Sequence, residues 1–266
     1  MSVLVVIPAR HASTRYPGKP LVPLRGATGA ARTLVERSWA AARAVAGVDR
    51  TVVATDDDRI AAAVRGFGGE VVMTSPDCRN GTERCAEAHA ALGGRFDTVV
   101  NLQGDAPLTP PWFVEALISA LETDRGAEIA TPVLRCEGAT LSGLLADRAA
   151  GRVGGTTAVF DRAGRALYFS KEVIPHTVGS YGAADPTPVF HHVGVYAYRP
   201  DALAAYPSWD IGPLETLEGL EQLRFLENGR PVTCVEVAAR GRMFWELNNP
   251  EDVDRIEAML AAMGEA

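Results

Sequence analysis

The sequence has no long apolar run. Its first aliphatic stretch, residues 3–7, is far shorter than the roughly 20 residues that a membrane-spanning helix needs. No basic segment precedes this stretch, and Pro8 and Arg10 follow it at once, so it does not resemble a secretion signal. These absences predict a cytoplasmic protein.

Cysteine and aromatic residues are also scarce. The four cysteines show no CxxC spacing, and a chain of 266 residues can bury a core without disulfides, so we expect them to be reduced. Aromatic residues make up only 7% of the chain, whereas a nucleic-acid binder combines a basic surface with aromatic stacking groups. With 47% apolar residues and no internal repeat, the composition excludes disordered and fibrous proteins.

Positive charge is concentrated near the amino terminus. The net charge of the chain is −7, but residues 1–50 contain eight arginine or lysine residues against Glu36 and Asp49. This segment is therefore net positive within an acidic chain, which favours a small anionic ligand over nucleic acid.

Strand and helix patterns alternate over the first half of the chain. Short apolar runs predict strands, and segments with helical periodicity lie between them. The expected strands are residues 3–7, 51–54, 70–73 and 98–102, and the expected helices are residues 30–46, 57–66, 82–92 and 110–121. This alternation predicts an α/β fold with a mostly parallel sheet, flanked by helices, that binds ligands at the carboxyl ends of its strands.

The pattern changes after Gly126. Strands are expected at 129–134, 156–160, 166–169 and 193–198, and residues 180–188 read as a mobile loop. Helices are expected at 214–227 and 250–263, with a strand at 232–237 between them. We therefore expect a single domain over 1–266 that carries a smaller, partly antiparallel insertion at approximately 126–212.

A basic loop follows the first expected strand. Its sequence, PARHASTRYPGKP over residues 8–20, combines three cations, two hydroxyls and a Gly-Lys pair at a strand end. Arginine, lysine and backbone N–H groups in such a loop can surround a polyphosphate. It is not a P-loop, because Ser13 and Pro20 stand where that motif requires glycine and a hydroxyl residue. The alternative is a solvated basic turn.

Two further motifs lie at strand or helix ends. Asp105, in the segment NLQGDAP, closes the strand at 98–102, where a carboxylate facing a polyphosphate can hold Mg²⁺. The alternative for Asp105 is a cap of the next helix or turn. The turn NGTER opens the helix at 82–92, so its N-terminus and Arg84 can meet a base, ribose or phosphate.

Together these motifs resemble a known family. The segments IPARHASTRYPGKPL, NGTER, NLQGDAP, ALYFSK, HHVGVYAY, PLETLEGLEQLR and NNPEDV occur in the order found in bacterial 3-deoxy-manno-octulosonate (Kdo) cytidylyltransferases. The resemblance spans nearly the whole chain. It implies a Rossmann-like nucleotidyltransferase fold, a homodimer, and an enzyme that uses CTP and Mg²⁺ to make a CMP-sugar for lipopolysaccharide or surface glycans.

The resemblance also assigns residues. It implies nucleotide binding by Arg10, Ser13, Arg15, Lys19, Arg84 and Gln103, with Arg15, Lys19 and Asp105 as catalytic residues. It implies acceptor binding by Lys171, His192, Glu221 and Gln222, and metal binding by Asp105 and Asn248. The alternatives are a hydrogen-bonded histidine at a strand end for His192, and a solvated helix face for Glu221 and Gln222.

Four positions depart from the family pattern. Ala106, Thr157, Lys171 and Asn248 stand where the family has glutamate, lysine, arginine and a metal-binding aspartate. An amide oxygen can bind Mg²⁺ but carries no charge. Two alternatives therefore stay open: a CTP-dependent transferase for another acidic acceptor, such as a phosphonate or sulfonate, and a non-catalytic nucleotide-binding paralogue.

Overall fold

The chain folds into two compact units in a computed structural model that describes residues 1–12, 16–153, 155–242 and 245–265. Unit 1 comprises residues 1–115, 199–204 and 239–266, and unit 2 comprises residues 116–198 and 205–238. No helix in the described part of the chain has the length and hydropathy needed to cross a bilayer. All four cysteines are free, as the sequence predicts.

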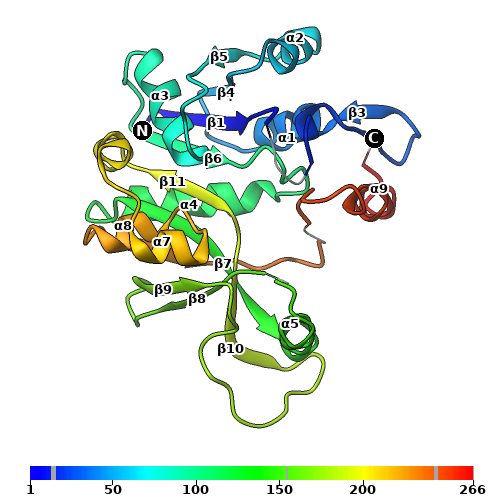
Figure 1. The fold of residues 1–266 in the computed structure, drawn as a ribbon, viewed down its shortest axis with the longest axis vertical. Helices are drawn as coiled ribbons and strands as arrows, with labels where there is room; N and C mark the ends of the chain where they lie inside the picture. Colours follow the sequence, from blue (N-terminus) through cyan, green and yellow to red (C-terminus); the bar gives the residue numbers. More distant parts are fainter. Residues whose placement is uncertain (13–15, 154, 243–244, 266) are drawn as a thin grey trace. The chain divides into compact units, whose positions relative to one another are not determined.

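Unit 1 contains four parallel strands in the order β5-β4-β1-β6 (Figure 1). They are β1 (Val3–Ala9), β4 (Arg50–Thr55), β5 (Val71–Met73) and β6 (Thr98–Leu102). The register pairs Ile7 with Val53 on one side of β1, and Val6 with Asn101 on the other. Parallel pairing brings the carboxyl ends of these strands to one edge of the sheet.

Three helices of unit 1 begin at polar residues that follow strands. Helices α1 (Leu34–Arg43), α2 (Asp58–Gly66) and α3 (Gly81–Ala91) pack against the sheet. Thr33, Asp57 and Asn80 cap them, each with a side-chain oxygen that accepts a hydrogen bond from a backbone N–H of the first turn. The expected helix at 30–46 was wrong at its start, because residues 31–33 form strand β3.

The rest of unit 1 packs around an apolar cluster. Strand β2 (Pro23–Arg25) pairs antiparallel with β3 (Ala31–Thr33), and η1 (Lys19–Leu21) is a 3₁₀ turn. Helix α9 (Asp252–Ala262) lies beside this hairpin, where Glu257 accepts a hydrogen bond from the Arg25 N–H (Figure 1). The cluster contains Leu24, Leu34, Leu108, Leu247, Ile256, Met259 and Leu260. It anchors residues 245–249 to the amino-terminal half of the chain.

Unit 2 is built on a mixed sheet. Its strands are β7 (Ile129–Glu137), β8 (Thr157–Phe160), β9 (Ala166–Ser170), β10 (Pro186–His192), β11 (Val195–Tyr198) and β12 (Val232–Glu236). Strand β7 is antiparallel to β10 and β11 and parallel to β12, and β8 and β9 continue the sheet beyond β10. The predicted fold class is therefore confirmed.

The structure corrects three predicted segments of unit 2. Helix α5 (Gly138–Ala149) was not predicted, because it buries only a narrow face. Residues 186–188, expected in a mobile loop, are the start of β10. The expected helix at 214–227 is two helices, α7 (Pro213–Glu218) and α8 (Leu223–Glu227), because Gly219 adopts a left-handed conformation with φ of 60° and ends α7.

Three further helical segments complete the chain. Helix α4 (Pro111–Thr123) begins in unit 1 and ends in unit 2. Helix α6 (Pro200–Ala205) is followed by the 3₁₀ turn η2 (Tyr206–Ser208).

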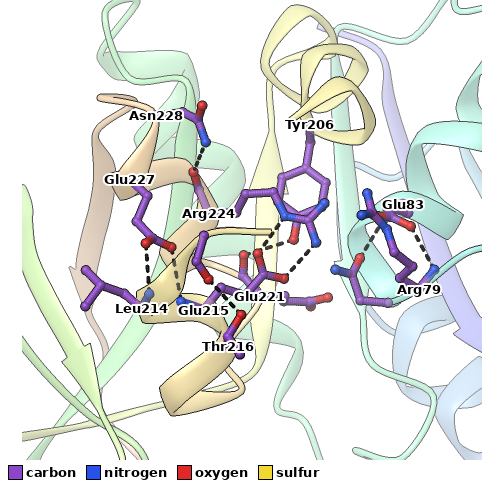
Figure 2. A network of polar contacts seen from close by, with 12 residues as sticks. Arg79, Glu83, Tyr206, Leu214, Glu215, Thr216, Glu221, Arg224, Glu227 and Asn228 are labelled. Carbon is purple, nitrogen blue, oxygen red and sulfur yellow. Dashed lines mark hydrogen bonds and ion pairs between the residues drawn. The ribbon is translucent and has the colours of Figure 1, made fainter. Parts of the chain in front are cut away.

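A buried ion pair holds α7 against α8. The Arg224 side chain is fully buried, and its Nε and Nη2 donate to the two carboxylate oxygens of Glu215 at 2.6 and 2.7 Å (Figure 2). The guanidinium also lies 4.2 Å from the ring centroid of Tyr206. The Glu227 carboxylate accepts hydrogen bonds from the backbone N–H groups of Leu214 and Glu215 at the start of α7. These contacts fix the turn between the helices, residues 219–222, from both sides.

We predict that Glu215→Ala destabilises the protein by about 3–5 kcal/mol, because it leaves the buried Arg224 charge without its partner. Glu236→Ala is the control, since Glu236 pairs with Arg135 at the surface and both side chains are more than 40% exposed. That change should cost less than about 1 kcal/mol. Urea unfolding followed by circular dichroism measures both, and equal losses would contradict the prediction.

Candidate functional site

The basic loop after β1 is closed by Gly18. Its N–H donates to the His11 carbonyl at 3.0 Å, and its φ of 73° lies in the left-handed region. The left-handed backbone favours glycine here, and a Cβ would also lie 3.1 Å from the His11 ring, which would have to shift slightly. Arg10 is exposed beside this turn. Ser13 and Arg15 lie outside the described residues, so their predicted roles stay predictions.

Lys19 and Asp105 meet at the carboxyl ends of β1 and β6. The Lys19 Nζ donates to Asp105 Oδ2 at 2.7 Å, and the two side chains are only 13% and 24% exposed. The chain reaches this point through Gly104, where a Cβ would lie 2.6 Å from the Pro8 carbonyl oxygen. The glycine therefore allows the end of β6 to approach the end of β1. The structure thus brings together a predicted phosphate ligand and the predicted metal ligand.

Asn248 lies in the segment adjacent to Asp105. The Leu247 N–H donates to the Asp105 carbonyl at 2.9 Å, and the Asp252 carboxylate accepts hydrogen bonds from the backbone N–H groups of Asn248 and Asn249. The Asn248 Nδ2 lies 3.4 Å from Glu246 Oε2. In the described part of the chain, no three histidine, cysteine or acidic side chains form a metal cluster. The backbone hydrogen bond from Leu247 thus brings the segment of Asn248 next to Asp105, and the metal-binding roles of these two residues stay predictions.

Arg84 is buried beneath the start of α3. Its side chain is 3% exposed, donates to Thr74 Oγ1 at 2.5 Å and lies 3.5 Å from Asp56 Oδ1. In this structure Arg84 therefore joins the ends of β4 and β5 to α3. Gln103 is half-buried, and its side-chain amide lies next to Gly81, the first residue of α3. A Cβ added at Gly81 would be 3.3 Å from the Gln103 Nε2.

Sequence reasoning assigned no role to two polar residues at this edge. Asp56 follows β4 and faces Arg84, and Asn101 is fully buried at the end of β6. No described residue hydrogen-bonds to the side-chain oxygen or nitrogen of Asn101. Position in the chain was the signal that could have identified them: Asp56 follows a predicted strand, and Asn101 lies within one.

His192 and Gln222 belong to one polar and aromatic cluster in unit 2. The His192 Nε2 lies 2.9 Å from Thr131 Oγ1, and its ring centroid is 5.6 Å from that of Tyr196. The Tyr196 hydroxyl donates to Gln222 Oε1 at 3.0 Å. Burial, reinforced by the neighbouring His191, lowers the pKa of His192 to about 3. His192 is therefore neutral at physiological pH and can offer hydrogen bonds but no positive charge.

Lys171 lies close to Gly219, and Glu221 follows Gly219 by two residues in the chain. The Lys171 backbone N–H donates to Glu218 Oε2 at 2.9 Å, and its Nζ would be 3.0 Å from a Cβ on Gly219. Glu221 is half-buried, and its carbonyl accepts a hydrogen bond from the Tyr206 hydroxyl. Unit 2 thus places the cation Lys171 close to the turn that carries Glu221 and Gln222.

Two of the departures from the family pattern have a structural role. Ala106 is buried, and its carbonyl accepts hydrogen bonds from Thr109. Thr157 is also buried, and its hydroxyl donates to the Glu172 carbonyl at 2.7 Å and accepts from the Ile174 N–H at 3.2 Å. Thr157 therefore uses its hydroxyl to hold the turn that follows Lys171.

Comparison with known proteins gives consistent matches along the chain. Residues 4–233 match the family model described as cytidylyltransferase. The chain is 48% identical to a 3-deoxy-manno-octulosonate cytidylyltransferase of Maricaulis maris, with 100% of this chain and 99% of that protein covered. It is 39% identical to an 8-amino-3,8-dideoxy-manno-octulosonate cytidylyltransferase of a Shewanella species, with 98% and 100% covered.

A solved structure is also similar. It is that of a CMP:2-keto-3-deoxy-manno-octonic acid synthetase complexed with CTP, with a TM-score of 0.82 and 31% identity over 99% of this chain and 100% of that one.

The pKa of His192 predicts a loss of stability in acid. The imidazole takes up its proton near pH 6.5 in the unfolded chain but only near pH 3 in the folded one, so protonation favours unfolding between these values. Between pH 7.5 and pH 5 this residue should cost about 2 kcal/mol of unfolding free energy. His192→Gln should lose less over the same interval in urea titrations. An equal loss in both proteins would refute the assignment.

Proposed function

The chain belongs to the 3-deoxy-manno-octulosonate cytidylyltransferase family, and on that basis we propose that it transfers CMP from CTP to Kdo and releases pyrophosphate. The observation that carries the proposal is the match to the Maricaulis relative over the full length of both chains. The solved relative with CTP bound supports the choice of nucleotide. The relatives give no support to a phosphonate or sulfonate acceptor, or to a non-catalytic protein.

The edge of unit 1 provides charge neutralisation for the triphosphate. An acceptor oxygen attacks the α-phosphorus of CTP and pyrophosphate leaves, so catalysis needs positioning and electrostatic stabilisation more than covalent help. Lys19 and Arg10 are the described cations of the phosphate loop, and Arg84 and Gln103 are proposed to lie along the nucleotide. The Lys19 ammonium is already held in place by Asp105 at 2.7 Å.

The carboxylate and amide at this edge fit a magnesium ion. Mg²⁺ is usually held by one or two carboxylates together with substrate phosphates and water, and Asp105 with Asn248 supplies one carboxylate and one amide oxygen. We propose that these two residues hold it. When bound, the metal would neutralise charge on the triphosphate and the leaving pyrophosphate. Because one ligand is neutral, we expect the metal affinity to be lower than with two carboxylates.

Unit 2 provides the groups proposed to bind the acceptor. Kdo is an acid, and because His192 is neutral, Lys171 is the residue of the proposed acceptor set that can pair with the acceptor carboxylate. His192, Glu221 and Gln222 are then left to hydrogen-bond the sugar hydroxyls. The buried Gln222 Nε2, which no described residue accepts from, supports this role.

We further propose a homodimer, with the cytoplasm as the compartment. Leu167 on β9 and Leu217 on α7 are 65% and 81% exposed, and the adjoining residues Tyr168 and Glu218 hydrogen-bond to each other. A second subunit would remove these two exposed apolar side chains from water. Sedimentation velocity of the purified protein tests this proposal.

The direct test of the function is a pyrophosphate-release assay. CTP and UTP are each offered with Kdo, with its 8-amino analogue and with other acidic sugars, in the presence of Mg²⁺. We expect turnover with CTP and Kdo. Faster turnover with the 8-amino sugar would assign the acceptor of the Shewanella relative instead, and no turnover with any acceptor would contradict an enzyme.

Lys19→Ala should weaken CTP binding roughly 10-fold or more, about 1.4 kcal/mol, because it removes a phosphate ligand and leaves the Asp105 charge beside the triphosphate. Lys171→Ala is the matched control: it removes the same charge from the proposed acceptor site, and should leave CTP affinity unchanged while raising the KM for Kdo. Calorimetric titration with CTP measures the affinities. If the two variants bind CTP equally well, the assignment of Lys19 is wrong.

Asn248→Asp should lower the Mg²⁺ concentration needed for half-maximal rate, because a second carboxylate strengthens magnesium binding where the metal is held. Asp105→Asn is the reference variant, and should abolish Mg²⁺-dependent turnover while changing the melting temperature by only a few degrees. A Mg²⁺ titration of the rate compares the three proteins. A higher Mg²⁺ requirement in Asn248→Asp would show that this residue is not a metal ligand.

A further inference from the structure

Glu218 connects two parts of unit 2 that carry proposed acceptor ligands. It is the last residue of α7, and its Oε1 accepts hydrogen bonds from Ser170 Oγ at 2.6 Å and from the Tyr168 hydroxyl at 3.3 Å. Its Oε2 accepts from the Lys171 backbone N–H at 2.9 Å. One carboxylate therefore holds the last residues of β9 and the first residue after it.

The residues after Lys171 are fixed separately. Ser170 Oγ accepts a hydrogen bond from the Glu172 N–H at 3.0 Å, and the Thr157 hydroxyl on β8 binds the backbone of Glu172 and Ile174. The turn at 172–174 is thus attached to β8, while Lys171 itself is attached to α7. The contact with Glu218 sets where Lys171 lies relative to that helix.

Helix α7 leads directly into the other acceptor ligands. Gly219 ends the helix, and Glu221 and Gln222 follow within three residues. The Lys171 Nζ would be 3.0 Å from a Cβ on Gly219, so its ammonium lies over the start of this turn. Gln222 is fixed in turn by the Tyr196 hydroxyl. Glu218 is therefore the residue through which the positions of Lys171 and Gln222 depend on each other.

The Glu218 carboxylate is ionised, which lets it accept the three hydrogen bonds. Its partial burial would raise its pKa, but the hydrogen bonds from Lys171, Ser170 and Tyr168, together with the Lys171 charge, outweigh burial and lower the pKa. An ionised carboxylate accepts all three hydrogen bonds, whereas an amide presents one oxygen and a nitrogen that can only donate.

We propose that Glu218 is a positioning residue for the acceptor: its carboxylate fixes Lys171 at the distance from Glu221 and Gln222 that matches the carboxylate and hydroxyls of an acid sugar. The inference rests on the proposed function. Glu218 acts through Lys171 and takes no part in binding CTP. Its loss should therefore weaken acceptor binding selectively.

Glu218→Gln and Glu227→Gln form a matched pair for the test. Each replaces one carboxylate by an amide, at the end of α7 for Glu218 and at the end of α8 for Glu227. The Glu227 carboxylate accepts its hydrogen bonds from the backbone at the N-terminal end of α7, whereas that of Glu218 accepts them from β9 and Lys171. We expect Glu218→Gln to raise the KM for Kdo roughly 10-fold, with a smaller change in kcat and no change in CTP affinity. Glu227→Gln should leave the KM for Kdo unchanged.

Hydrogen exchange gives a second readout that needs no acceptor. The amide of Lys171, which donates to Glu218, should exchange faster in Glu218→Gln than in the wild type, and at the wild-type rate in Glu227→Gln. If Glu218→Gln does not fold, Ser170→Ala removes the 2.6 Å donor and carries the same expectation with a smaller effect.

The outcomes separate the inference from the proposed function. If the wild-type protein turns over Kdo, the inference alone is overturned in either of two cases. One is an unchanged KM for Kdo in Glu218→Gln, and the other is an equal rise of this KM in both glutamine variants. Absence of turnover with Kdo in the wild-type protein would overturn the proposed function and the acceptor role of Glu218 with it, even if the exchange rates change as expected.

Discussion

Parallel pairing of β1 with both β4 and β6 is the constraint on which the proposed nucleotide site depends. In a parallel sheet the carboxyl ends of neighbouring strands meet at one edge, so polar residues that follow different strands become neighbours. Lys19 and Asp105 are 86 positions apart in the sequence, yet they lie 2.7 Å from each other. Two glycines make this approach possible, because Gly18 closes the loop after β1 and Gly104 passes close to Pro8.

The proposed acceptor site depends on a buried ion pair. Arg224 is fully buried and paired with Glu215, and this pair holds together the two short helices on either side of residues 219–222. A buried ion pair contributes little net stability compared with an apolar pair, but it requires one geometry to satisfy both charges. Here that geometry determines where Glu221 and Gln222 lie. Glu218 also fixes a neighbouring segment through its charge, because its carboxylate binds the backbone N–H of Lys171.

The departures from the family pattern are of different kinds. Ala106 is part of the core, and Thr157 holds a turn through its hydroxyl, so neither presents a charge to a ligand. Lys171 keeps a positive charge where the family has arginine, but as a compact ammonium in place of a planar fork. Asn248 is the change that bears on the proposed metal site, since it puts an amide where the family has a carboxylate, in the segment next to Asp105.

Sequence alone determined the fold class and the family. Continuous apolar strands, capped helices and the ordered motifs are local features, and they predicted the four parallel strands of unit 1 to within about two residues. Local pattern failed where distant segments decide the structure. Residues 31–33 became a strand because they pair with residues 23–25, and residues 186–188 became a strand because they belong to β10, which lies between β7 and β8 in the mixed sheet.

Only the tertiary structure decided the state of the site residues. The motifs named His192, but its neutrality comes from burial beside His191, which no spacing reveals. They named Arg84, but its burial against Thr74 and Asp56 depends on three elements meeting. Glu218 lay unassigned within a recognised motif, because its partners are on β9, about 50 residues away in the sequence. Residue identity is local, whereas protonation state, burial and partner choice depend on the whole fold.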